Sequence, residues 1–386
     1  MKIVSLFSGI GGLEYGFSKK KHEVVLFCEN DLAATTVLQK RHSDVLLTRD
    51  VADLRSLPKC DLVTAGFPCQ DLSQAGSKQG IQGKKSGLVN HLFRLLRPLS
   101  TRPEWLLVEN VPYMLNLDRG GAMDVLTQSV EKLGYTWCYR TIEARSFGLP
   151  QRRPRVVFLA SLNHDPREVI LSQNKPALNI DSRPSDIDRS AAYGFYWTEG
   201  SRGVGWAYES VPPIKGGSAI GIPSPPAVWI PQEDFVGTIS IGDAERLQGF
   251  PPGWTSSVGR TSGLRSSARW RLVGNAVNTR LSKWIAERFE TPRAYEFSED
   301  VERKKGAWPK AAWGTSGKSY TSCVSMYPTH RKLIKLSDFL NDPLKPLSPR
   351  ATSGFLSRTK VCTNVVYSPD FIKSLEIHLD RCDVTC

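Results

Sequence analysis

A short apolar segment that ends in glycine, proline and cysteine places the strongest constraint on the fold of this chain. Residues 60–65 form a run that is typical of a buried strand, and Gly66-Phe67-Pro68-Cys69 follows without a break. Cys69 is therefore expected on a loop at the carboxyl end of a strand, the edge at which open α/β sheets bind ligands. The segment predicts either a reactive thiol or, as for most single cysteines, a half-buried structural side chain.

Two strand-like runs near the N-terminus also end in residues suited to a ligand. Residues 2–7 lead into the turn Ser8-Gly9-Ile10-Gly11-Gly12 and then a helical pattern, so a ligand can approach the backbone there. Residues 23–28 end at Glu29, where an acid often binds the hydroxyl pair of a ribose. The alternative is that Asn30 or Asp31 caps the next helix, and both interpretations can hold together.

Three later segments carry further candidate contacts. Asp50 follows a strand expected at residues 44–47 and is suited either to an adenine amine or to a surface loop. Glu109 ends the run at residues 105–108, where burial would raise its pKa and favour proton donation; it could instead cap a helix. Arg152, Arg153 and Arg155 precede another strand and suit phosphate or base contacts, or a solvated edge.

Charge and cysteine usage indicate the class of protein. The net charge is +13, which favours a polyanionic partner such as nucleic acid over a merely basic protein. The eight cysteines show no zinc spacing, so we predict reduced thiols and no metal site. No apolar run reaches membrane-spanning length and no cleavage site follows the N-terminal strand. We therefore expect a cytoplasmic protein, associated with the nucleoid and not with a membrane.

Changes in composition suggest domain boundaries. The polar, glycine-rich segment 73–88 resembles a functional lid more than a disordered insert. Periodicity fades between residues 163 and 236, where Gly, Pro, Ser and aromatic residues dominate, and the Trp and Tyr content argues against disorder. We expect a core at 1–162, a smaller irregular domain at 163–238, a return to the core at 239–290, and an extension of unknown role at 291–386.

Six segments in order resemble the motifs of the DNA cytosine-5 methyltransferase family, from about residue 2 to residue 289. They are Phe7-Ser8-Gly9-Ile10-Gly11-Gly12, Gly66-Phe67-Pro68-Cys69-Gln70, Glu109-Asn110-Val111, the spaced Gln151, Arg153 and Arg155, Arg246-Leu247-Gln248-Gly249-Phe250-Pro251, and Gly274-Asn275-Ala276-Val277. Any one of them could arise by chance, but six in the correct order could not. Residues 163–236 are the least similar part.

The resemblance implies a fold, a reaction and a set of partners. The fold would be α/β, with a Rossmann-like S-adenosylmethionine-dependent methyltransferase domain and a smaller target-recognition domain at 163–238. The reaction would be methylation of cytosine C5 in a specific double-stranded DNA sequence, with the base flipped out of the duplex. We expect a monomer that protects DNA in a restriction-modification system, beside a separate endonuclease.

The resemblance also implies roles for single residues. Cys69 would add to C6 of cytosine and Glu109 would bind or protonate N3, while Arg153 would support the base and Arg155 would hold the loop and the acid. Eight residues would line the S-adenosylmethionine site: Phe7, Gly9 and Gly11 at the methionine end, Glu29 at the ribose, Asp50 and Val51 at the adenine, and Asn275 and Ala276 at the closing wall.

The chain departs from the family pattern at three positions and leaves two rival functions open. Ser5 stands where an acid is usual, Ser8 where Ala is commoner, and Arg49 where Gly usually precedes Asp50. A tRNA cytosine-5 methyltransferase of the same fold would share the chemistry, but the long 163–236 segment favours a DNA reader. A catalytically idle nucleic-acid-binding protein would have no chemical reason to retain Cys69, Glu109 and Arg153 together.

Overall fold

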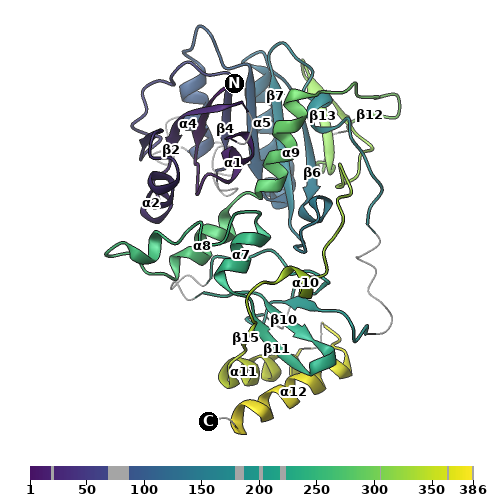
Figure 1. Cartoon of the computed structure of the whole chain (residues 1–386). Coiled ribbons are helices and arrows are strands. Elements are labelled where there is room, and N and C mark those ends of the chain that lie inside the picture. Colours follow the sequence, from purple (N-terminus) through teal and green to yellow (C-terminus); the bar gives the residue numbers. More distant parts are fainter. Residues whose placement is uncertain are drawn as a thin grey trace. The chain divides into compact units, whose positions relative to one another are not determined.

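The computed structural model describes residues 1–18, 21–67, 87–178, 187–199, 203–217, 223–304, 306–362 and 365–384. The chain divides into two compact units, each described here by itself (Figure 1). Unit 1 comprises Met1–Ser146, Pro154–Ala177 and Val277–His330, and unit 2 comprises Phe147–Arg153, Leu178–Ala276 and Arg331–Cys386. Cys69 and most of the expected lid at 73–88 lie outside the described residues.

Unit 1 is built on a sheet in which ten strands are described, in the order β12-β14-β13-β6-β7-β5-β4-β1-β2-β3. Its parallel part consists of β1 (Lys2–Leu6), β2 (Glu23–Cys28), β3 (Leu46–Thr48), β4 (Leu62–Ala65) and β5 (Trp105–Asn110). The chain winds outward from β1 to β3 and then returns to the other side of β1 for β4 and β5. The point between β1 and β4 is therefore the switch point at which such sheets bind ligands.

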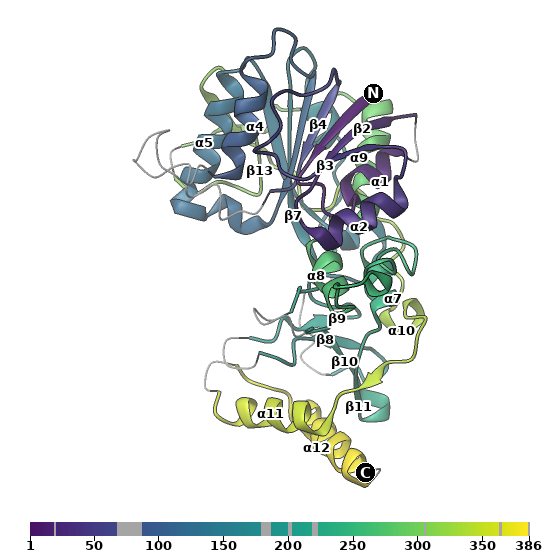
Figure 2. The same cartoon turned by 90° about the vertical axis from the view of Figure 1, so that its left-hand side faces the viewer.

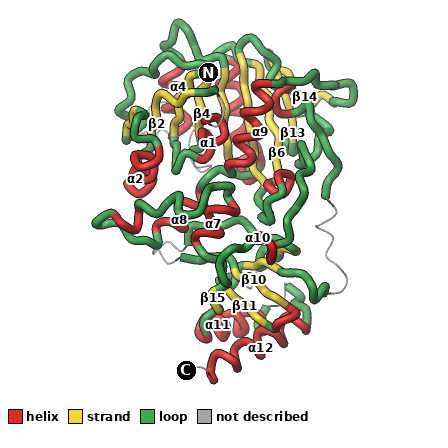
Figure 3. The backbone as a smooth tube through the Cα atoms, in the orientation of Figure 1, coloured by secondary structure: helices red, strands yellow, loops and turns green. Residues whose placement is uncertain are grey.

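Antiparallel strands complete the sheet of unit 1. They are β6 (Thr136–Glu143), β7 (Pro154–Ser161), β12 (Val301–Glu302), β13 (Ala311–Thr315) and β14 (Lys318–Thr321). The mixed sheet confirms the predicted α/β class. Helices and strands of the whole chain are distinguished by colour in Figure 3.

Helices cover both faces of this sheet. They are α1 (Gly12–Ser18), α2 (Leu32–Arg41), α4 (Leu88–Leu96), α5 (Gly121–Glu131), α6 (Arg167–Ile170) and α9 (Thr279–Glu290), with short 3₁₀ turns at Pro112–Leu115, Leu117–Gly120 and Ala144–Phe147. Figure 2 shows α4 and α5 on one face and α1 and α9 on the other. None of the helices in the described part of the chain is long and apolar enough to cross a bilayer.

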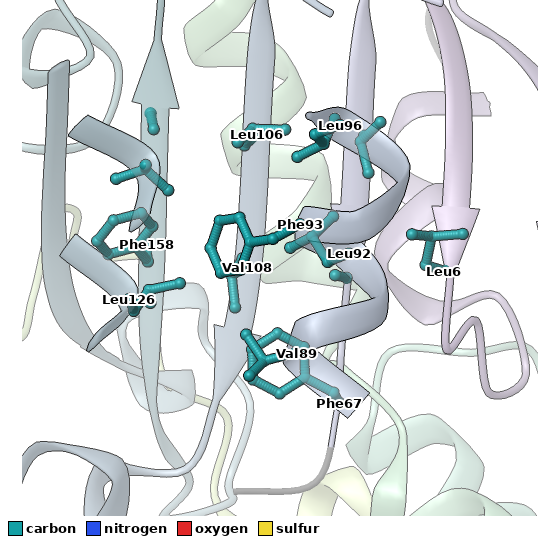
Figure 4. Packing of buried hydrophobic residues seen from close by; sticks show 14 of the residues in the cluster. Leu6, Phe67, Val89, Leu92, Phe93, Leu96, Leu106, Val108, Leu126 and Phe158 are labelled. Atoms are coloured by element: carbon teal, nitrogen blue, oxygen red, sulfur yellow. The ribbon is translucent and has the colours of Figure 1, made fainter. Parts of the chain in front are cut away.

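The apolar core under α4 fixes which strand residues face which side. Leu6, Val108 and Leu106 pack against Leu92 and Phe93 of α4 in this buried cluster (Figure 4). Because successive side chains of a strand point to opposite faces, the neighbours of these core residues face α1 and α9 instead. Ser5 of β1 and Glu109 of β5 belong to that second set.

A close backbone approach joins α1 to α9. The amide of Gly16 donates to the hydroxyl of Ser282 at 2.9 Å. A Cβ atom at Gly16 would lie 2.2 Å from the backbone nitrogen of Lys283, so only glycine fits there. The helix that follows the glycine turn is thus packed closely against α9.

Unit 2 contains a second sheet with the strand order β15-β11-β10-β8-β9 among its described residues. The strands are β8 (Tyr193–Phe195), β9 (Ala207–Tyr208), β10 (Ala227–Ile230), β11 (Phe235–Thr238) and β15 (Lys345–Pro346), all antiparallel. The helices are α7 (Ile241–Leu247), α8 (Ala268–Asn275), α10 (Leu336–Phe339), α11 (Pro349–Lys360) and α12 (Pro369–Val384), with 3₁₀ turns at Pro231–Glu233 and Val258–Arg260.

Apolar side chains are buried on both faces of this second sheet. Trp229 of β10 belongs to an aromatic cluster with Phe355 of α11 and Phe371 of α12. Its neighbour Val228 packs in a separate cluster that includes Leu336 of α10. The α11 and α12 helices therefore supply one half of the core of unit 2.

The compact units differ from the division that composition suggests. Residues 291–330 belong to unit 1 because β13 pairs with β6, and residues 331–386 belong to unit 2 because their apolar side chains complete its core. Residues 239–276 also belong to unit 2. The segment 163–236, expected to be irregular, contains β8 to β10 and the start of β11.

Candidate active site

The glycine turn after β1 has an unusual backbone. Phe7, Gly9 and Gly11 all have positive φ angles, of 57°, 56° and 77°. A non-glycine residue rarely adopts this conformation, so the strain at Phe7 marks a site held by its surroundings. The ring of Phe7 packs edge-on against the ring of Phe67, which follows β4, with their centroids 6.0 Å apart. The two strand ends at the switch point thus contact each other.

Glu29 connects this turn to the end of β2. Its Oε2 accepts a hydrogen bond from the amide of Gly9 at 2.7 Å, and its Oε1 accepts one from the amide of Asp31 at 2.9 Å. Burial raises the pKa of Glu29, and these backbone hydrogen bonds oppose the rise. Asp31 itself caps α2 by accepting from the amide of Ala34 at 2.9 Å, as the alternative interpretation of this segment expected.

The end of β3 lies beside the end of β2, because the amide of Glu29 donates to the carbonyl of Thr48 at 3.0 Å. Asp50 follows and is exposed, with its Oδ1 accepting from the amide of Ala52 at 2.8 Å. Val51 is buried, and its carbonyl accepts from Arg94 of α4 at 2.8 Å. The loop that carries Asp50 and Val51 is therefore fixed at both its backbone and its side chains.

The two serines that depart from the family pattern form one buried network. Ser5 donates to the hydroxyl of Ser8 at 2.8 Å. Ser8 in turn lies 3.1 Å from the carbonyl of Ser5 and 3.2 Å from the amide of Cys28. The hydroxyl of Ser8 thus joins the turn to the end of β2, which an alanine could not do.

Glu109 and Arg155 meet on adjacent strands. Glu109 lies within β5, which extends through Asn110 and is two residues longer than the sequence suggests. Arg155 of β7 places its Nε 3.0 Å from Glu109 Oε1, and the side chains are only 11% and 9% exposed. The structure therefore brings together the predicted acid and the arginine expected to hold it.

Asn110 is a site residue to which the sequence analysis gave no role. Its Nδ2 donates to the carbonyl of Phe67 at 3.0 Å, and its Oδ1 accepts from the amide of Val111 at 2.9 Å. The side chain thereby anchors the last described residue before the Cys69 loop. The signal was present in the Glu109-Asn110-Val111 motif, of which only the acid was interpreted.

Unit 2 holds the remaining predicted residues. Arg153 is buried, and its Nη2 donates to the carbonyls of Gly274 and Ala276 at 2.9 and 2.8 Å. Asn275 lies between these carbonyls, is exposed and ends α8. The structure therefore brings Arg153 together with Asn275 and Ala276, through a backbone anchor that sequence reasoning did not foresee.

The sequence and the fold are similar to those of known proteins. A model of the C-5 cytosine-specific DNA methylase family matches residues 1–190. The chain is 56% identical over 384 residues to the type II methyltransferase M2.BsuMI of Bacillus subtilis (strain 168), covering 99% of each. It is 27% identical to the type II methyltransferase M.DsaV of Dactylococcopsis salina, covering 75% of this chain and 85% of that one. The S. pombe Dnmt2 methyltransferase structure shares the fold, with a TM-score of 0.55, 18% identity, and coverage of 75% and 98%.

Proposed function

The chain belongs to the C-5 cytosine-specific DNA methylase family, and on that premise we propose how its residues carry out the reaction. It is a DNA cytosine-5 methyltransferase. We propose that it acts on cytosine within a specific double-stranded sequence and protects that sequence in a type II restriction-modification system. The observation that carries the residue assignment is the buried Glu109–Arg155 pair, at the sheet edge where β4 leads toward Cys69.

S-adenosylmethionine fits the strand ends around the glycine turn. Nothing lies within 4 Å of a Cβ built on Gly9, so a ligand can approach the backbone there. The carboxylate of Glu29 already accepts two backbone hydrogen bonds and retains lone pairs for a ribose hydroxyl pair. We propose that Phe7, Gly9 and Gly11 hold the methionine end. When bound, this group supplies the electrophilic methyl.

Four further residues are proposed for the adenine end and the closing wall of the cofactor site. We assign the adenine to Asp50 and Val51, because their loop is fixed beside Glu29. Asn275 and Ala276 are proposed as the closing wall. The anchor from Arg153 to the neighbouring carbonyls supports a fixed backbone at that wall.

The protein groups act on the cytosine ring. We propose that the Cys69 thiolate forms a bond to C6 and pushes electron density toward C5 and N3. Glu109 donates a proton or a hydrogen bond to N3 and so stabilises the negative charge that develops there, and Arg155 fixes the orientation of that acid. After C5 has accepted the methyl group, loss of the C5 proton expels the thiolate and restores the aromatic ring. Arg153, which is anchored to backbone carbonyls, is proposed to support the base on its O2 side.

The target base must leave the duplex before Cys69 can reach C6, at a cost of about a few kcal/mol. We propose that residues 73–88 close over the flipped base. We propose that residues 163–238 read the DNA site, and that the net charge of +13 of the whole chain favours binding to its phosphates.

Trapping with a mechanism-based substrate tests these roles. Duplex DNA in which 5-fluorocytosine replaces cytosine cannot lose a proton from C5, so the covalent adduct accumulates. We expect a stable complex on a denaturing gel for the wild type and none for Cys69→Ala. A complex that forms equally well with Cys69→Ala would contradict the assignment of the nucleophile.

A further inference from the structure

A buried carboxyl group lies directly behind the glycine turn. Glu14 of α1 is 1% exposed, and its Oε1 accepts a hydrogen bond from the hydroxyl of Thr64 at 2.6 Å. Its Oε2 is buried and has no hydrogen-bond partner among the described residues. A purely structural position of this kind would be better filled by an apolar side chain, because an unsatisfied buried oxygen costs stability.

The location of this group connects two parts of the site. Ser5 and Thr64 are opposite each other in the parallel pairing of β1 and β4, at the switch point. Ser5 lies shortly before Phe7 in the sequence, and Thr64 lies shortly before Phe67. Glu14 belongs to the helix whose first residue, Gly12, ends the glycine turn. The Glu14–Thr64 hydrogen bond therefore joins the cofactor side of the switch point to the strand that leads to Cys69.

Glu14 is suited to this role in its neutral form. Burial raises the pKa of Glu14, and the hydrogen bond from the Thr64 hydroxyl opposes the rise. The carbonyl oxygen of a neutral carboxylic acid can accept the hydrogen bond from the Thr64 hydroxyl, as an amide oxygen would. The protein then avoids the cost of a buried charge. The opposite side of α1 is fixed by the Gly16–Ser282 contact, so the helix has little freedom to shift.

We propose that Glu14 is a positioning residue, which through Thr64 fixes the distance between the S-adenosylmethionine turn and the strand that carries the nucleophile loop. The inference rests on the proposed function, since it assumes that the glycine turn holds the methyl donor. It predicts an effect on methyl transfer that is larger than the effect on cofactor binding, because the residues proposed to contact the cofactor are all retained.

The test compares Thr64→Val, Glu14→Leu and Glu14→Gln in the full chain. We expect single-turnover methylation of duplex DNA to fall about tenfold in the first two, because small misplacements of reacting groups are costly. The dissociation constant for S-adenosylmethionine, measured by calorimetry, should change less than about threefold. Glu14→Gln should restore a rate within about threefold of the wild type, because its amide oxygen still accepts from Thr64.

A matched control separates positioning from stability. Thr127→Val removes another buried threonine hydroxyl, which donates to the carbonyl of Met123 within α5, and should leave the transfer rate unchanged. If Thr64→Val lowers only the melting temperature, or if Glu14→Gln is as damaging as Glu14→Leu, the proposal is wrong.

Hydrogen exchange tests the link without reference to activity. Thr64→Val should speed exchange at the amides of residues 8–12, whereas Glu14→Gln should not. A wild type that binds S-adenosylmethionine but methylates nothing would overturn the proposed function. In that case the exchange result still decides the role of Glu14, with unchanged exchange in Thr64→Val counting against it.

Discussion

Arg155 orients Glu109 through a contact of 3.0 Å between its Nε and Glu109 Oε1, in surroundings that exclude most water. The two side chains project from neighbouring antiparallel strands, so the sheet itself sets their spacing. Breaking such a pair leaves the remaining charge buried and uncompensated. Glu109 therefore depends on Arg155 for its position at the edge of the sheet.

Replacing Arg155 with lysine should slow the reaction without weakening DNA binding. Lysine keeps the charge but cannot place a planar N–H group against Glu109 in the same geometry. We expect kcat to fall about tenfold or more and the KM for DNA to change less than about threefold. Steady-state transfer of a labelled methyl group measures both. Arg167→Lys, which alters an arginine paired with Asp165, should behave as the wild type; equal losses in both variants would contradict the assignment.

Asn110→Asp should impair the Cys69 loop more than its small change in shape suggests. The substitution replaces the Nδ2 donor with an oxygen that faces the carbonyl of Phe67, so attraction becomes repulsion. We expect adduct formation on 5-fluorocytosine DNA to slow by at least about tenfold. Asn163→Asp, at an exposed asparagine that contacts Glu104, is the control. An unaffected trapping rate in Asn110→Asp would show that the anchor has no catalytic role.

Affinity for S-adenosylmethionine should fall as the pH is lowered. The proposed ribose contact requires ionised Glu29, whose pKa is raised above the ordinary 4.5 by burial. Protonation of Glu29 removes the charged acceptor. The wild-type dissociation constant for S-adenosylmethionine should therefore rise as the pH falls toward the raised pKa of Glu29. Glu29→Gln should bind more weakly at neutral pH and with little pH dependence. Calorimetry at a series of pH values measures the dissociation constant of both proteins. A wild-type dissociation constant that does not change with pH would refute the ribose role.

Glu14 should make the folded protein less stable as the pH rises, whereas cofactor affinity is expected to weaken as the pH falls. Its folded-state pKa is raised, so its contribution is fully present below the unfolded value of about 4.3 and is lost as the pH rises through the folded value. We expect the melting temperature of the wild type, relative to Glu14→Gln, to decline as the pH rises above about 4.3. Parallel curves for the two proteins would indicate that the acid is not perturbed.

The C-terminal helices should be essential for unit 2. Phe371 is buried in the aromatic cluster with Trp229, so Phe371→Ala should cost about 3–5 kcal/mol of unfolding free energy. Val361→Ala, at a residue 78% exposed in the same tail, should cost less than about 0.5 kcal/mol. Denaturant unfolding measures both. Similar values for the two variants would mean that α12 is not part of the core.

The local features of the sequence predicted much of unit 1. The apolar run at residues 23–28 located β2 at its observed bounds, and the glycines after β1 indicated the turn with positive φ angles. The helix cap at Asp31 was also predicted, whereas the ribose role of Glu29 stays a prediction. These signals depend on residues close together in the chain.

Contacts between distant segments were beyond such reasoning. The pairing of β13 with β6 and the burial of Phe371 against Trp229 join the tail to two different cores, and no short-range pattern encodes either. The same holds for the Glu14–Thr64 hydrogen bond, which links residues 50 positions apart. Asn110 was missed for a different reason: its motif was recognised, but no role was predicted for its side-chain amide. The placement of Cys69 stays a prediction, because it lies outside the described residues.

Bisulfite sequencing of DNA from a methylation-free bacterial host that expresses this chain tests the central claim most directly. A parallel culture expressing Cys69→Ala is the control. The account predicts cytosines protected from conversion in one short recurring sequence context, and none with the variant. If the expressed protein is folded and binds S-adenosylmethionine but protects no cytosine, the assignment of DNA as its substrate is contradicted.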